Sequence, residues 1–154
     1  MITEKVLNLP DEVLLNGKFC VTRKGEKQPY DPFLNRLISA KDTFYDFLKI
    51  YEVLDQYDSL GIKVGNGISA IDIDDCISNG VINDVAMDII RKAQTYTEVS
   101  PSGTGIRILF KSKNPFDRNA YKIKNSQNGI EYYDGDDQER YGARMVRLSG
   151  NKIF

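Results

Sequence analysis

The stretch ISAIDIDD, residues 68–75, closes on alternating isoleucine and aspartate. Alternation with a period of two is typical of a β-strand, in which successive side chains point to opposite faces. Ile71 and Ile73 are therefore expected on one face, and Asp72 and Asp74 on the other. Two carboxylates on one patch repel each other, and a divalent cation that takes an oxygen from each removes that cost. The alternative is a strand end that frays into a polar Asp-Asp loop.

The segments around this stretch predict further strands. Asn66-Gly67 lies between residues 61–64 and 68–74, and Asn-Gly between two β-prone runs predicts a hairpin. Other β-prone runs, bounded by turn residues, are residues 18–22, 96–99, 105–111, 129–133 and 143–149. Pro29-Tyr30-Asp31-Pro32 is expected to be extended or turn-like, because each proline disfavours helix in the residue before it.

Two segments predict helices, because their apolar residues recur at spacings of three and four. The first begins at Ser39 and runs through residue 55, and the second spans residues 83–93. The buried stripe of the second helix is expected to contain Val85, Ala86, Ile89 and Ile90. Helices interleaved with recurrent hairpins predict an α/β class, mixed, with a largely antiparallel sheet. A length of 154 residues predicts one domain, residues 1–154.

The composition excludes much of enzyme chemistry, because the chain contains no histidine. Histidine-based triads, histidine-ligated metals and histidine acid-base steps are therefore unavailable. Cys20 and Cys76 form no CxxC pair and are expected to be small buried hydrophobes. Apolar runs are too short for a membrane span, and the first residues resemble no secretory signal. We expect a cytoplasmic protein without a membrane partner.

Basic residues are clustered near the middle of the second half of the chain. Between Arg107 and Lys124 there are six basic residues and one acidic residue, although the net charge of the chain is −1. A basic stretch that follows an acidic cluster suits phosphate-rich ligands handled through divalent metals. The alternative is a solvated basic face.

Two further motifs carry candidate binding groups. The loop SPSGTG, residues 100–105, leads into a strand that opens with Arg107, and it offers hydroxyls, backbone N–H groups and a guanidinium to a polyphosphate. An ordinary turn between strands is the alternative. Glu131 interrupts the β-prone run GIEYY, and it would become a third carboxylate ligand if its strand lay beside that of Asp72 and Asp74.

The order of these motifs resembles the catalytic domain of the archaeo-eukaryotic primase superfamily, in its phage and plasmid primase-polymerase branch. The resemblance rests on FCVTRKGEKQPYDP, IDIDDC, SPSGTGIRI, GIEYY and RMVRLSGN, and it covers residues 17–151. It implies an N-terminal αβ unit packed on an RRM-like half, with the active site in the cleft between them. Such a domain is either complete or excised from a longer primase-helicase, with a replicative helicase as a further partner.

The resemblance also implies a reaction and its residues. Asp72, Asp74 and Glu131 would hold two Mg²⁺ or Mn²⁺ ions for nucleotidyl transfer from nucleoside triphosphates on a single-stranded DNA template. Arg107, Ser102, Thr104 and Gly105 would bind the nucleotide. The residues expected to contact nucleic acid are Arg23, Lys27, Lys111, Lys113, Lys122, Lys124 and Arg144.

One position departs from the family pattern. Gly105-Ile106-Arg107 falls where the family has small-x-His, and that histidine contacts the incoming triphosphate. Either Arg107 is a phosphate clamp with a fixed charge, or the domain has lost catalysis and kept binding. A catalytically degenerate single-strand-binding or regulatory module is therefore the alternative function, and a metal-dependent nuclease built on the same acids is a third.

Overall fold

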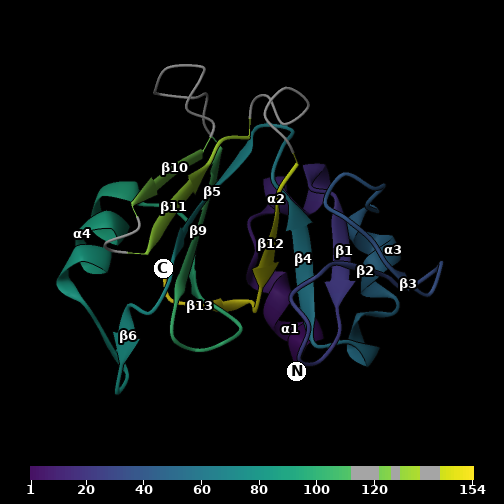
Figure 1. Ribbon diagram of the computed structural model, residues 1–154, viewed down its shortest axis with the longest axis horizontal. Coiled ribbons are helices and arrows are strands. Elements are labelled where there is room, and N and C mark those ends of the chain that lie inside the picture. Colours follow the sequence, from purple (N-terminus) through teal and green to yellow (C-terminus); the bar gives the residue numbers. More distant parts are fainter. Residues whose placement is uncertain (112–121, 126–128, 136–142) are drawn as a thin grey trace.

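The computed structural model describes residues 1–111, 122–125, 129–135 and 143–154. Its described parts form a mixed α and β architecture with few helices, and the strand pairs between its elements are antiparallel, as the sequence predicted. Two sheets face each other, with helix α4 on the outer side of one and the short N-terminal helices and α3 around the other (Figure 1). No helix in these described parts has the length and apolarity to cross a membrane.

The first sheet has the strand order β12-β4-β1-β2-β3. Its strands are β12 (Met145–Leu148), β4 (Ser59–Lys63), β1 (Phe19–Thr22), β2 (Tyr30–Asp31) and β3 (Arg36–Leu37). Around it lie α1 (Ile2–Lys5), the 3₁₀ turn η1 (Val6–Asn8), α2 (Asp11–Asn16), α3 (Phe47–Tyr51) and the 3₁₀ turn η2 (Leu54–Gln56). Phe19, Ile50 and Leu60 belong to the apolar core that these elements share.

The second sheet has the order β10-β11-β5-β9-β8-β13. Its strands are β10 (Lys122–Asn125), β11 (Ile130–Tyr133), β5 (Ile68–Ile73), β9 (Ile106–Lys111), β8 (Thr97–Val99) and β13 (Asn151–Lys152). The outer face packs against α4 (Asp84–Ala93), where Ile73, Ile106 and Ile108 meet Ala86 and Ile90. The inner face contributes Ile68, Ala70 and Leu109 to the core between the sheets.

Strand β5 has the alternation that its sequence predicted. Ile71 and Ile73 pack on the α4 side, whereas Asp72 lies on the inner face and Asp74 follows directly after the strand end. The backbone of Asp74 is held by a bond from its N–H to the carbonyl of Gly129. The Asp-Asp end of the strand is therefore tied to the neighbouring β11 segment rather than frayed.

The hairpin predicted at Asn66-Gly67 is wrong. β4 and β5 lie in different sheets, and only Gly65 and Ile68 form a bridge across the turn. Gly65, Asn66 and Gly67 all have positive φ, so the turn itself forms. The strands beyond it diverge because each is buried against a different sheet partner. The turn at Asn66-Gly67 therefore connects two different sheets, and not two paired strands as predicted.

A hairpin that the sequence did not predict lies at Asn79-Gly80. β6 (Ile77–Ser78) and β7 (Val81–Ile82) pair across these two residues. Both turn residues have positive φ, as a type I′ hairpin turn requires. The hairpin leads into α4, whose N-cap Asn83 accepts a hydrogen bond from the N–H of Ala86 at 2.9 Å.

The helix predicted over residues 39–55 is wrong over most of its length, because α3 spans only Phe47–Tyr51 and is followed by the 3₁₀ turn η2. Tyr45 exchanges both backbone hydrogen bonds with Phe19, which extends the chain along the edge of β1. In α4 the predicted bounds hold, but Val85 is 45% exposed rather than buried. Cys20 and Cys76 are free and buried, as expected.

Candidate functional site

A row of charged residues crosses the inner face of the second sheet at one end of β5. In the strand register, Glu131 of β11 lies opposite Asp72 of β5, Asp72 opposite Arg107 of β9, and Arg107 opposite Glu98 of β8. Directly opposed residues of antiparallel strands share a face. The neighbouring rung on this face is apolar, with Ala70 and Leu109. The charged row therefore lies at the margin of the core, where the two sheets open.

Arg107 is ion-paired with the two aspartates. Its Nη1 donates to Oδ1 of Asp72 and lies 3.9 Å from Oδ1 of Asp74. The side chain is only 11% exposed, and its Nε has no hydrogen-bond partner among the described residues. The sequence predicted Arg107 in a nucleotide clamp beside the serine loop, whereas the structure places its charge on the acidic pair.

Asp72 is the acidic residue most affected by this environment. Burial raises the pKa of its carboxyl to about 6, Arg107 opposes the rise, and the negative charges of Asp74 and Glu131 add to it. Burial therefore keeps the pKa of this carboxyl above its ordinary value even though Arg107 contacts it directly. Asp72 and Asp74 share the one guanidinium of Arg107, so their negative charge is only partly neutralised and can attract a further cation.

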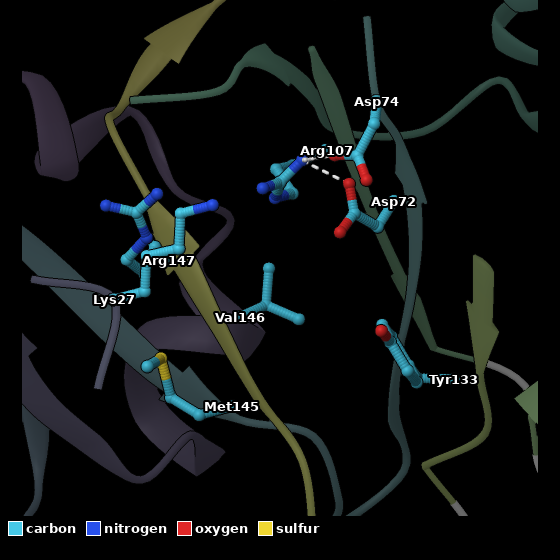
Figure 2. A pocket seen from close by; sticks show the side chains of 8 residues that line it. All are labelled: Lys27, Asp72, Asp74, Arg107, Tyr133, Met145, Val146 and Arg147. Carbon is cyan, nitrogen blue, oxygen red and sulfur yellow. Dashed lines mark hydrogen bonds and ion pairs between the residues drawn. The ribbon is translucent and has the colours of Figure 1, made fainter. Parts of the chain in front are cut away.

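A cavity of about 210 Å³ lies over the acidic pair and reaches both sheets. On the second sheet it is lined by Asp72, Asp74, Arg107 and Tyr133. On the opposite side it is lined by Met145, Val146 and Arg147 of β12, and by Lys27 of the β1–β2 loop. Figure 2 shows Lys27 and Arg147 on one side of the space and the two aspartates on the other. The cavity thus has an acidic wall and a basic wall.

Arg147 contributes positive charge to the second wall. Burial and the nearby Arg107 both lower its pKa, and within the described part of the chain no carboxylate forms an ion pair with it. A half-buried guanidinium that no described carboxylate neutralises by direct contact is suited to bind an anion.

Glu131, the predicted third ligand, lies opposite Asp72 in the strand register, but it does not form a three-ligand metal group with Asp72 and Asp74. Its carboxylate accepts a hydrogen bond from the hydroxyl of Tyr133. In residues 1–111, 122–125, 129–135 and 143–154, no group of three or more Asp, Glu, Cys or His side chains is arranged to hold a metal ion. The donor chemistry of Asp72 and Asp74 nevertheless fits a divalent cation, because both are carboxylates and their charge is only partly neutralised.

The hydroxyl-rich loop forms a turn of its own. Ser102 bonds to both Ser100 and Thr104 at 3.0 Å through hydroxyls, and the described residues that line the cavity do not include Ser102 or Thr104. Gly105 has a structural reason to be glycine, because a Cβ there would lie 2.8 Å from the carbonyl oxygen of Ile73. Gly105 therefore lets the loop approach the strand that carries Asp72 closely, and the hydroxyls of Ser102 and Thr104 lie outside the described lining of this cavity.

The basic residues predicted to bind nucleic acid are dispersed. Lys27 reaches the cavity, but Arg23 bonds to Glu26 and lies over the ring of Tyr30. Lys111 lies 3.8 Å from Glu12, at the far end of β9. The guanidinium of Arg144 lies 3.5 Å from the carbonyl of Ala143. Lys122 and Lys124 belong to β10, and Lys113 lies outside the described residues.

Four residues that line the cavity were not predicted as site residues from the sequence: Tyr133, Met145, Val146 and Arg147. Their strands alternate, so that Met145 and Arg147 share one face of β12 and Glu131 and Tyr133 share one face of β11. This alternation is visible in the sequence. The sequence does not reveal that β12 faces β5 across the space between the sheets.

Comparison of the chain with protein-family models finds no match, and comparison with curated proteins likewise finds none.

Proposed function

We propose that this protein is a metal-dependent nucleotidyltransferase that synthesises DNA or a primer on a single-stranded template. The observation that carries the proposal is the cavity with Asp72 and Asp74 on one wall and Arg147 and Lys27 on the other. A nucleoside triphosphate bound with a divalent cation has the complementary pattern, with positive charge on one side and phosphate oxygens on the other. The order of motifs, which resembles primase-polymerases, supports the same assignment.

Asp72 and Asp74 would hold the cation, with Glu131 as their neighbour on the next strand. A divalent ion bound there supplies Lewis-acid stabilisation of charge on phosphoryl oxygens. The protein holds the triphosphate from the opposite side, where Arg147 and Lys27 donate to its oxygens. The apolar rung beside the charged row excludes water from one flank and strengthens these charge interactions.

A second candidate is a nucleic-acid-binding or regulatory module without catalysis. The ion pair between Arg107 and Asp72 favours it, because a carboxylate already paired with a guanidinium is a poorer metal ligand. The basic wall would then bind a phosphate of the nucleic acid backbone.

The two candidates differ in one assay. The protein is incubated with labelled nucleotides, a single-stranded DNA template with and without primer, and Mn²⁺ or Mg²⁺. We expect labelled product from the wild type and at least about a 100-fold loss in Asp74→Asn, because metal ligands act as a unit. A shift of the template without product supports the binding module, and shortening of the template supports a nuclease.

A further inference from the structure

One nitrogen atom of Arg107 serves both aspartates. Nη1 donates to Asp72 and lies 3.9 Å from Asp74, so the guanidinium lies between two carboxylates. A divalent ion that takes an oxygen from each carboxylate needs the same place. The guanidinium and the metal are therefore alternatives.

Another nitrogen of the guanidinium lacks a hydrogen-bond acceptor among the described residues. This atom, Nε, is buried. A buried donor without a partner is unfavourable, and an arginine has further donors to offer to a new anion. The neighbouring Arg147 repels Arg107 across the same cavity, which further favours an anion between them.

We propose that Arg107 is an internal counter-ion that a divalent cation displaces from Asp72 and Asp74, and that the displaced guanidinium then binds the phosphate that arrives with the cation. The inference rests on the proposed function and deepens it by coupling the two halves of the ligand. A metal ion alone must compete with Arg107 for the two aspartates. When a triphosphate binds with the metal ion, its phosphate takes the place of the aspartates as the partner of Arg107, so the metal ion and the triphosphate each favour binding of the other.

The test measures Mn²⁺ binding by isothermal titration calorimetry, without catalysis. Arg107→Gln should bind Mn²⁺ about tenfold or more tightly than the wild type, because the competing hydrogen bonds from a charged group are removed. Arg107→Lys keeps the charge and should bind like the wild type. Arg147→Gln is the matched control, because it removes one positive charge from the same cavity without removing the ion pair, and its gain should be smaller.

A second titration tests the coupling. A non-hydrolysable nucleoside triphosphate should raise Mn²⁺ affinity in the wild type and raise it much less in Arg107→Gln. The inference is overturned if Arg107→Gln, folded by circular dichroism, binds Mn²⁺ no more tightly than Arg147→Gln. If Arg107→Gln does not fold, the Nε–H resonance of Arg107 in the wild type decides. It should move on addition of millimolar Mg²⁺, and an unmoved signal overturns the exchange.

The outcome for the exchange is separable from the outcome for the proposed function. Nucleotide incorporation by the wild type, with unchanged Mn²⁺ affinity in Arg107→Gln, overturns the exchange and keeps the polymerase. Tighter Mn²⁺ binding in Arg107→Gln without incorporation under any condition keeps the exchange and overturns the polymerase.

Discussion

Asp72 carries a carboxyl whose pKa is raised chiefly by burial, although Arg107 beside it opposes the rise. Its pKa of about 6 lies above the ordinary value of 3.8, so the folded state binds a proton more readily than the unfolded state. Stability from this source is present below the ordinary pKa and is lost as the pH rises through 6. The sequence predicted that this aspartate shares a patch with Asp74, because strand alternation requires it. The partner that neutralises them was not predicted, because cross-strand pairing with Arg107 depends on the register.

The Asp72→Asn variant should show this linkage directly. Between pH 4 and pH 7, the free energy of unfolding of the wild type should fall by about 2 kcal/mol because of this group. In the variant this contribution to the pH dependence should be absent. Urea unfolding followed by circular dichroism at several pH values measures it. Asp88→Asn, whose carboxylate is exposed and pairs with Lys92, is the control and should leave the slope unchanged.

Gly105, which has no side chain, allows the start of β9 to approach the end of β5 closely. We expect Gly105→Ala to lower the free energy of unfolding by about 1–3 kcal/mol, because the new Cβ would press on the backbone oxygen of Ile73. Gly103 in the same loop has no atom within 4 Å of such a Cβ, and its φ is +81°. Gly103→Ala should therefore cost only about 1 kcal/mol, the penalty of a left-handed backbone. Equal losses in the two variants would contradict the close approach at Gly105.

At the scale of the elements, the sequence predicted the strands and helices whose bounds depend on neighbouring residues in the chain. The strand and helix bounds around β1, β5, β9 and α4 agree with alternation and spacing. The Asn-Gly pairs at residues 66–67 and 79–80 show the limit, because both produce the turn but only Asn79-Gly80 produces a hairpin. Whether the strands on either side of a turn pair with each other depends on which sheet buries each strand, and that is a tertiary choice.

The N-cap of α4 gives an element-scale prediction. Asn83→Ala removes the bond to the N–H of Ala86 and should destabilise the protein by about 1 kcal/mol. Lys92→Ala, which removes an exposed ion pair from the same helix, should change stability by less than about 0.5 kcal/mol. Thermal unfolding of both variants compares the effects, and an equal loss would remove the capping role.

At the scale of the molecule, the two sheets are joined through a buried carboxylate. β12 of the first sheet continues through Ser149 and Gly150 into β13 of the second. Glu98, fully buried, accepts hydrogen bonds from the N–H groups of Ser149 at 2.7 Å and Gly150 at 2.9 Å, and from the hydroxyl of Tyr96 at 2.7 Å. The sequence predicted β12 and the strand that carries Glu98, but neither the short strand β13 nor that a glutamate secures this link.

Glu98→Gln should therefore destabilise the whole protein rather than one strand. An amide cannot accept all three of these bonds, and we expect a loss of about 2 kcal/mol or more in the free energy of unfolding. Glu12→Gln, which changes an exposed partner of Lys111, should be close to neutral. Urea denaturation of the two variants tests the contrast, and a neutral Glu98→Gln would contradict the role given to this link.

The pairing of β12 with β4 also has a consequence for the order of folding. The paired residues lie more than 80 positions apart in the sequence, as in Met145 opposite Lys63. Such a long loop closes slowly, because its entropy is lost before the contact stabilises the chain. The β1–β4 and β5–β9 pairs form over shorter separations and should be in place first. The strand that carries Arg147 would then arrive late, so that the protein completes most of its two sheets before it closes the cavity that Arg147 lines.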